Sequence, residues 1–152
     1  MPGPRDGCRA VSIDVSFEGA AHKGVMSCEY VLAAISRTPA IRPLVLILKQ
    51  QLTERNLSES YAGGLSSYAL FIMVTRFVEE SPSTDVGSLL LGFLDFYGNY
   101  FDPRVCGISL RRRCFFNRAS AVRISPQFDP LYLEDPLTEG NNAGRYTCPR
   151  VI

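Results

Sequence analysis

Residues 67–78 are apolar on almost every side when they are placed on a helix. A helix of this kind has no polar face to turn toward water, so other elements must enclose it. The pattern therefore predicts the central helix of a bundle, which excludes an isolated surface helix here.

Three further stretches have helical periodicity. Residues 25–36 are weakly amphipathic, and residues 42–57 carry one apolar stripe on a helix that Pro43 can begin. Asp85 can cap a fourth helix, because an aspartate side chain accepts hydrogen bonds from the free N–H groups of a first turn. The apolar positions of that helix are Val86, Leu89, Leu90, Phe93, Leu94 and Tyr97. Four helices in a chain of 152 residues, enough for a single core, predict a mainly α domain.

Short strands are expected around this helical block. Residues 11–17 alternate apolar and polar side chains with a period of two, which is typical of a half-buried strand with Asp14 on its open face. Residues 105–110 and 114–116 indicate a hairpin, residues 131–133 another strand, and the tail after them is rich in turns. The expected fold class is mainly α with an α+β remnant, namely a helical domain with a small peripheral β-hairpin and one N-terminal strand.

Charge and cysteine content narrow the function classes. Sixteen Lys and Arg against fifteen Asp and Glu leave a net charge of +1, so attraction for nucleic acid must come from a local patch. The five cysteines are odd in number and never spaced as Cys-x-x-Cys, which argues against a disulfide framework and a zinc site. The longest apolar run, residues 68–74, is far shorter than the roughly 20 residues that span a bilayer. We expect a soluble, intracellular chain that does not contact a membrane.

Two single residues could carry chemistry. Asp14 could hold a divalent cation, but such a site needs several oxygen ligands and one strand supplies one, so on its own a solvated aspartate is favoured. Lys49 follows an apolar run, where a lysine usually extends its ammonium to water. Its alternative role is a fixed cation that faces phosphate.

Two segments are more informative. Gly63-Gly64-Leu65-Ser66-Ser67-Tyr68 opens the apolar helix, and its N–H groups, hydroxyls and helix dipole would make an anion site, or its serines would simply cap the helix. Tyr68 could stack on a base or lie in the core. The run Arg111-Arg112-Arg113, interleaved with Phe115, Phe116 and Arg118, is either a surface for single-stranded nucleic acid or a solvated turn.

Taken together, these segments resemble the noncanonical poly(A) RNA polymerases, terminal nucleotidyltransferases of the DNA polymerase β-like superfamily. The likeness runs in the order of the family through four motifs and covers most of residues 11–145. The motifs are Ser12-Ile13-Asp14-Val15-Ser16-Phe17, Leu46-Ile47-Leu48-Lys49-Gln50, Gly63-Gly64-Leu65-Ser66-Ser67-Tyr68, and Leu133-Glu134-Asp135-Pro136-Leu137 with Gly140-Asn141-Asn142-Ala143-Gly144-Arg145.

The resemblance implies a role for each matched position. Asp14 would be the third catalytic carboxylate and a ligand of the Mg²⁺ or Mn²⁺ pair. Lys49 and Ser67 would bind the triphosphate of ATP, and Tyr68 would stack on the incoming base. Asp135 and Asn141 would lie near the base edge in a nucleotide recognition motif, residues 133–145.

The same resemblance divides the chain. Residues 1–18 are expected to be a remnant of the catalytic palm, and residues 19–152 the helical central domain, known as the poly(A) polymerase-associated domain. Glu18 and Gly19 depart from the Asn-type residues that related enzymes tend to place near the ribose. The Gly-Ser motif and two further carboxylates that precede the third in this family are not found ahead of Asp14. This chain alone is therefore expected to be inactive.

The implied activity is transfer of AMP from ATP to RNA 3′ ends in RNA processing or exosome-linked surveillance. Implied partners are the RNA 3′ end, a zinc-knuckle RNA-binding protein and an RNA helicase, and the expected location is the nucleus. The alternative is a non-catalytic RNA- or protein-binding module that has kept the helical scaffold.

Overall fold

The computed structural model describes residues 13, 15, 23–120 and 130–147. Four α-helices follow one another in the first part of the described chain, as the sequence predicts. Their bounds are α1 Gly24–Arg37, α2 Ile41–Glu54, α3 Ser67–Glu80 and α4 Val86–Asp95. Helix α2 ends before the expected Leu57, because Asn56 takes a left-handed conformation (φ 56°) that an α-helix cannot continue. A 3-10 turn, Ser60–Ala62, then leads into α3.

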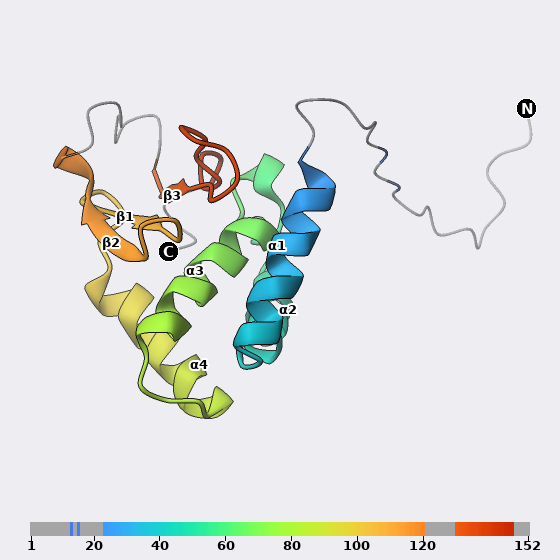
Figure 1. The fold of residues 1–152 in the computed structure, drawn as a ribbon, viewed down its shortest axis with the longest axis vertical. Coiled ribbons are helices and arrows are strands. Elements are labelled where there is room, and N and C mark those ends of the chain that lie inside the picture. Colours follow the sequence, from blue (N-terminus) through green and yellow to red (C-terminus); the bar gives the residue numbers. More distant parts are fainter. Residues whose placement is uncertain (1–12, 14, 16–22, 121–129, 148–152) are drawn as a thin grey trace, which may run out of the picture.

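Helix α3 is the central element, which confirms the prediction from its all-round apolar sequence. It lies between α1 and α2 on one side and α4 and the sheet on the other (Figure 1). The Ser66 side chain caps its start by accepting a 3.1 Å hydrogen bond from the Ala69 N–H. Its buried residues are Ala69, Leu70, Phe71, Ile72, Met73, Val74, Thr75, Arg76 and Val78.

Helix α4 is capped as predicted, since Asp85 Oδ2 accepts a 2.7 Å hydrogen bond from the Ser88 N–H. It continues into a π-helical segment, Phe96–Tyr100, that the periodicity does not reveal. Tyr97 is buried there, and its hydroxyl donates to the Met73 carbonyl of α3 at 3.0 Å. Leu94 belongs to the predicted apolar stripe of this helix but is 45% exposed. The buried face is narrower than that stripe and consists of Leu89, Phe93 and Tyr97.

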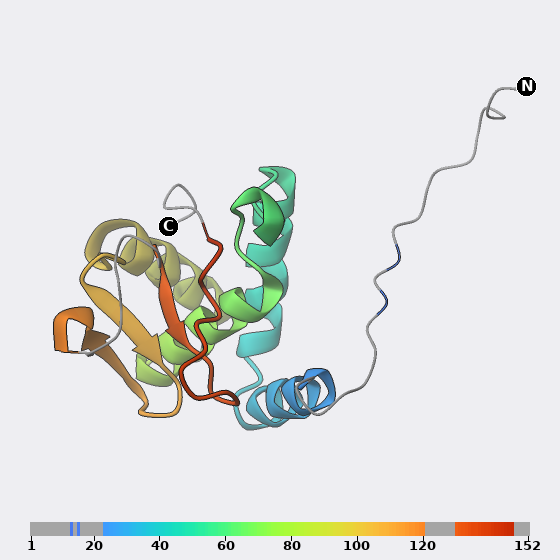
Figure 2. The ribbon, with the colours of Figure 1, turned by 90° about the horizontal axis from the view of Figure 1, so that it is seen from above.

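A three-stranded sheet covers the other side of α3. Strands β1 (Cys106–Ser109) and β2 (Cys114–Asn117) form the predicted antiparallel hairpin. Strand β3 (Tyr132–Glu134) pairs with β1 in parallel, which gives the order β2-β1-β3. A 3-10 turn, Arg118–Ser120, follows β2. Figure 2 shows the chain after β3 running back across the helices toward α1.

The expected N-terminal strand lies almost entirely outside the described residues, and so does Asp14. Ile13 and Val15 are described, and neither belongs to a strand; they are 78% and 73% exposed. Cys28, Cys106 and Cys114 are free thiols. Among the described helices none alone is long and apolar enough to cross a membrane; α1 and α2, bent by 118° at their junction, pass that test only as a pair.

Candidate functional site

A cavity of about 580 Å³ lies between α1, α2 and the first turns of α3. Lys49 lines it from α2, and Ser67 and Tyr68 line it from α3. Lys49 comes from one motif, and Ser67 and Tyr68 come from another, so the fold brings together the side chains that the resemblance assigns to the triphosphate and the base. Much of the remaining wall is apolar and consists of Val31, Leu32, Ile35, Ile41, Val45, Leu46 and Phe71. Arg42, at the start of α2, also lines the cavity, and an apolar wall with a few polar groups is typical of a small-molecule site.

The two serines at the start of α3, Ser66 and Ser67, have different positions and contacts. Ser66 caps the helix, so of the two predicted roles, helix capping and anion binding, the capping role is confirmed for Ser66. The neighbouring Ser67 is exposed at the first helical position and faces the cavity. A free hydroxyl beside the positive end of a helix dipole can donate to an anion.

The glycine pair does not offer the free N–H groups that the sequence suggests. The Gly63 N–H donates to the Ser60 carbonyl at 3.1 Å, and the Gly64 N–H donates to the Glu59 carbonyl at 2.8 Å. Gly63 has a φ of 85°, and a Cβ on Gly64 would lie 2.4 Å from the Leu57 carbonyl oxygen. Both glycines therefore serve the tight turn itself.

Tyr68, Asp135 and Asn141 form one hydrogen-bonded group, although 67 residues separate the first two. The Tyr68 hydroxyl donates to Asp135 Oδ1 at 3.3 Å, and Asn141 Nδ2 donates to Asp135 Oδ2 at 2.8 Å. The Tyr68 ring also stacks on Phe71, with 6.2 Å between the ring centroids. The three residues predicted to surround a base are thus neighbours in space.

Burial and the adjacent carboxylate set the ionisation of this group. Burial, and then the negative charge of Asp135, raises the pKa of Tyr68 well above its ordinary value, so Tyr68 keeps its proton. Burial also raises the pKa of Asp135, but hydrogen bonds from Asn141 and from the Leu137 N–H outweigh it, and the pKa lies below its usual value. Asp135 is therefore a carboxylate at neutral pH that accepts from its neighbours.

Two further residues of this region have contacts that the sequence analysis did not foresee: Lys23 was not named there, and Asn142 was named only as part of a motif, without a role. Lys23, just before α1, donates from Nζ to the Leu137 carbonyl at 2.6 Å and so joins the start of α1 to the recognition segment. Asn142 Oδ1 accepts from the N–H groups of Leu133 and Gly144, both at 2.9 Å, and holds the turn after β3. The Lys23 contact joins residues far apart in sequence, and the Asn142 contacts close an irregular turn. No local sequence pattern predicts either kind of contact.

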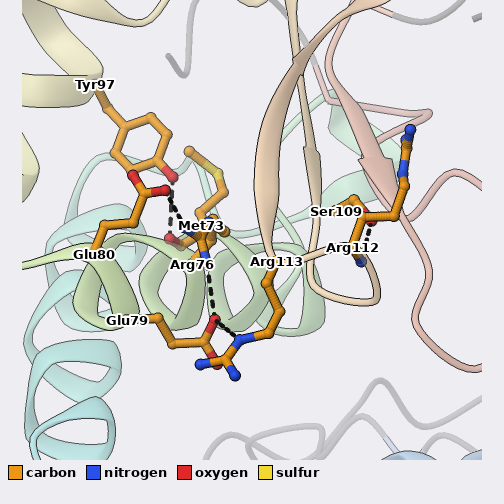
Figure 3. Close-up of polar contacts among 8 residues, drawn as sticks. All are labelled: Met73, Arg76, Glu79, Glu80, Tyr97, Ser109, Arg112 and Arg113. Atoms are coloured by element: carbon orange, nitrogen blue, oxygen red, sulfur yellow. Dashed lines mark hydrogen bonds and ion pairs between the residues drawn. The ribbon is translucent and has the colours of Figure 1, made fainter.

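The arginine run lies in the turn between β1 and β2, and each member faces a carboxylate of this chain. Arg111 lies 4.0 Å from Glu139, and Arg112 lies 3.2 Å from Glu134 and stacks over the Phe116 ring. Arg113 lies 3.9 Å from Glu79 (Figure 3). All three are exposed, so RNA binding by this turn stays a prediction, but their charge is partly neutralised within the protein.

Arg118 is a correction, because it was grouped with these surface arginines and is only 2% exposed. Its guanidinium donates to the Pro103 and Pro130 carbonyls, so it joins the segment before β1 to the segment before β3. Phe115 is also turned inward, against Phe96 and Phe101. Two of the six residues of the predicted charge-and-aromatic surface, Phe115 and Arg118, are therefore part of the packing.

Within residues 23–120 and 130–147, no group of three or more His, Cys, Asp or Glu side chains could hold a metal ion. The one predicted metal ligand, Asp14, lies outside the described residues, and so do Glu18 and Gly19.

Comparison with known proteins identifies the family. Residues 85–141 match the model described as Cid1 family poly A polymerase. The chain is 37% identical to Poly(A) RNA polymerase gld-4 of Caenorhabditis elegans, over 90% of this chain and 18% of that protein. It is 32% identical to "Inactive non-canonical poly(A) RNA polymerase protein Trf4-2" of Drosophila melanogaster, over 89% of this chain and 36% of that protein. The chain thus spans about a fifth to a third of these relatives.

Solved structures support the same relationship. The protein described in "Structure and function of the polymerase core of TRAMP, a RNA surveillance complex" is 26% identical, with a TM-score of 0.75, over 84% of this chain and 43% of that one. A Cid1 poly(U) polymerase structure described as "Mg 3'-dATP bound" is 20% identical, with a TM-score of 0.70, over 86% of this chain and 53% of that one. The second likeness shows the fold alone.

Proposed function

Because this chain is related in sequence and fold to the noncanonical poly(A) RNA polymerases, we propose that it is the nucleotide-binding helical part of an RNA 3′-end adenylyltransferase. The observation that carries the proposal is the shared cavity. Lys49, Ser67 and Tyr68 line it, and Tyr68 is hydrogen-bonded to the carboxylate that also holds Asn141. The substrate would be ATP and the acceptor an RNA 3′ end.

The side chains have distinct roles in this proposal. The Lys49 ammonium and the Ser67 hydroxyl neutralise and orient the triphosphate at the dipole end of α3. The Tyr68 ring offers one face to the base, since its other contacts fix its orientation against Phe71 and Asp135. The Asn141 amide, fixed by Asp135, offers both a donor and an acceptor to adenine.

The metal enters the proposal through Asp14. A divalent Mg²⁺ or Mn²⁺ pair, when bound, would activate the RNA 3′ hydroxyl and stabilise charge on the transferred phosphate. Its ligands would be Asp14 and two further carboxylates for which this sequence offers no Asp-x-Asp pattern. We therefore propose that this chain binds the nucleotide and does not transfer AMP on its own.

The setting of the activity follows the relatives. We propose that the chain serves RNA processing or surveillance in the nucleus, because a similar protein is the polymerase core of an RNA surveillance complex. Its proposed partners are a zinc-knuckle RNA-binding protein and an RNA helicase. Their contact surfaces would include the exposed faces outside the nucleotide cavity.

A titration of the chain with ATP and with adenosine, followed by NMR, tests the proposal. ATP should shift the resonances of residues that line the cavity. Lys49→Gln and Ser67→Ala should weaken the binding of ATP more than that of adenosine, because only ATP carries the triphosphate. Arg55→Gln removes an exposed charge from a different cavity and should change neither. ATP shifts that lie elsewhere, or that Lys49→Gln leaves unchanged, would contradict the assignment.

A second candidate is a non-catalytic module of the same family. A similar Drosophila protein is named as inactive, so this scaffold occurs in a protein described without activity. ATP binding would be weak or absent in such a module, while the helical fold would be the same. The same titration therefore separates the two candidates.

A further inference from the structure

A second cavity, of about 450 Å³ and with a more polar lining, lies where α1 ends and α2 begins. The last turns of α3 and the β1–β2 turn form its other walls. Ile41 lines both cavities, but their polar groups on α3 lie apart, since Ser67 and Glu79 are separated by about 18 Å along the helix at about 1.5 Å per residue. The residues that give the second cavity its polar character are Arg37, Thr38, Thr75, Glu79 and Arg113.

Thr75 on α3 provides the first sign of a ligand. The residue is only 3% exposed and lines the cavity, and its Oγ1 has no hydrogen-bond partner among the described residues. A threonine within a helix usually bonds the backbone carbonyl one turn earlier, and a buried hydroxyl without a partner costs free energy. Thr75 therefore has a buried hydroxyl with an unused donor and acceptor, on a residue that lines the cavity.

The charges around the cavity provide the second sign. Glu79 Oε2 already accepts from Arg76 Nη1 at 3.0 Å, and Arg76 also pairs with Glu80 (Figure 3). Arg113 lies 3.9 Å from Glu79 through Nε and keeps its other N–H groups for a further acceptor. Arg37 has no ion pair within residues 23–120 and 130–147. Two arginines and one glutamate line the cavity, and the Arg76–Glu80 pair beside it is neutral, which leaves an excess of one positive charge.

From this geometry we propose that the second cavity binds a phosphate group, either free phosphate or a phosphodiester of RNA. The guanidinium groups of Arg37 and Arg113 would bind its oxygens, and the Thr75 hydroxyl would donate from the floor of the cavity. The start of α2 adds the positive end of its dipole, whereas the last turns of α1 and α3 add negative ends, so the arginine side chains must supply the attraction for the anion. The cavity is larger than one phosphate needs, which leaves room for the sugars on either side of a phosphodiester. The site is separate from the proposed triphosphate site and does not depend on the proposed function.

NMR titrations with inorganic phosphate, and separately with single-stranded oligo(A), test this site. Phosphate should shift the resonances of Thr75, Arg113 and the first turn of α2. Thr75→Val keeps the shape of the side chain and should bind phosphate roughly tenfold more weakly, the factor expected from one hydrogen bond to a charged group. Arg37→Gln should have a similar effect, and Arg55→Gln, at a different cavity, should have none.

The second set of variants separates the two phosphate sites and the two phosphate sources. Lys49→Gln should leave the shifts around Thr75 unchanged, even if it abolishes binding at the nucleotide cavity. A parallel loss of oligo(A) affinity in Thr75→Val and Arg37→Gln identifies an RNA phosphodiester as the ligand. A loss of phosphate affinity alone identifies free phosphate. Phosphate shifts around Thr75 that neither variant reduces, or that Arg55→Gln reduces equally, would overturn the proposal.

Discussion

Asp135 holds residues 133–145 in contact with Tyr68 and fixes the position of Asn141. Its two carboxylate oxygens accept from Tyr68 and Asn141, which lie on different elements, and it also accepts from the Leu137 N–H at 2.9 Å. Three donors on one buried carboxylate favour the charged form. The position of the Asn141 amide therefore depends on the ionisation of Asp135.

This dependence predicts the response to acid. The pKa of Asp135 is lower in the folded chain than its ordinary value of about 3.9, so its contribution to stability is complete above that value. The contribution is lost as the pH falls from about 4 through the lower folded pKa. Asp135→Asn should lower the free energy of unfolding at pH 7 by about 1–2 kcal/mol, since hydrogen bonds to a charged group are lost.

Urea unfolding between pH 2.5 and pH 7, a range that brackets the ordinary Asp pKa of about 3.9, measures this effect. Asp135→Asn should also flatten the acid dependence of stability relative to the unmodified chain. Asp95→Asn is the matched control, because Asp95 is an exposed aspartate whose one side-chain hydrogen bond within residues 23–120 and 130–147 comes from Asn99, four residues later. An acid dependence that is the same in Asp135→Asn and the unmodified chain would show that Asp135 does not carry it.

Asn141 should decide which base is preferred. An amide can complement the amine and ring nitrogen of adenine, whereas an imidazole at this position would reduce the space and favour a pyrimidine. The chain should bind ATP more tightly than UTP by about 1–3 kcal/mol, the value of one hydrogen-bonded base edge. Asn141→His should reduce or reverse that difference in paired NMR titrations. A preference for UTP in the unmodified chain would be evidence against base selection by this residue.

The individual site residues were predictable only in part. Tyr68, Asp135 and Asn141 were named from motif likeness, and the fold places them in contact. Lys23 could not be named, because its bond to Leu137 spans 114 residues and a lysine beside a polar turn is common. The burial of Arg118 could not be foreseen either, since its charge gave no sign of the carbonyls that surround it.

At the scale of the elements, the turn before α3 has no room for a Cβ at Gly64. A Cβ on Gly64 would lie 2.4 Å from the Leu57 carbonyl oxygen and 2.7 Å from the Glu59 nitrogen, and backbone atoms cannot move aside. Gly64→Ala should lower the free energy of unfolding by about 1–3 kcal/mol, as overpacked positions do. It should also weaken ATP binding, because the same turn sets the position of Ser67.

Gly98→Ala is the matched control for this substitution. A Cβ on Gly98 meets nothing within 4 Å, and alanine favours helical backbone more than glycine, so stability should stay equal or rise by up to about 1 kcal/mol. Chemical denaturation of both variants gives the comparison. Equal stability of Gly64→Ala and Gly98→Ala would show that the turn can open without cost.

The elements themselves were largely predictable because their signals are local. The caps Ser66 and Asp85 and the apolar period fix the starts of α3 and α4. The π-helical turn at Phe96–Tyr100 was not predictable, since its register is set by packing of Tyr97 on α3. The parallel pairing of β3 with β1 is likewise a tertiary choice that a strand of three residues does not encode.

For the molecule as a whole, the question is whether the helical part is sufficient for catalysis. With ATP, Mg²⁺ and an oligo(A) primer, we expect no transfer of AMP by this chain, because one aspartate cannot replace the group of carboxylates that such cations require. Fusion of the chain to the part of a related polymerase that carries only the Gly-Ser motif and the first two carboxylates should restore transfer, with Asp14 as the third carboxylate and the proposed nucleotide cavity supplied by this chain. Asp14→Ala in the fusion should abolish transfer again, while leaving the binding of adenosine unchanged. If the unfused chain transfers AMP and Asp14→Ala abolishes that transfer, the chain's own residues complete the metal site. If the fusion still transfers AMP after Asp14→Ala, Asp14 is not one of the catalytic carboxylates.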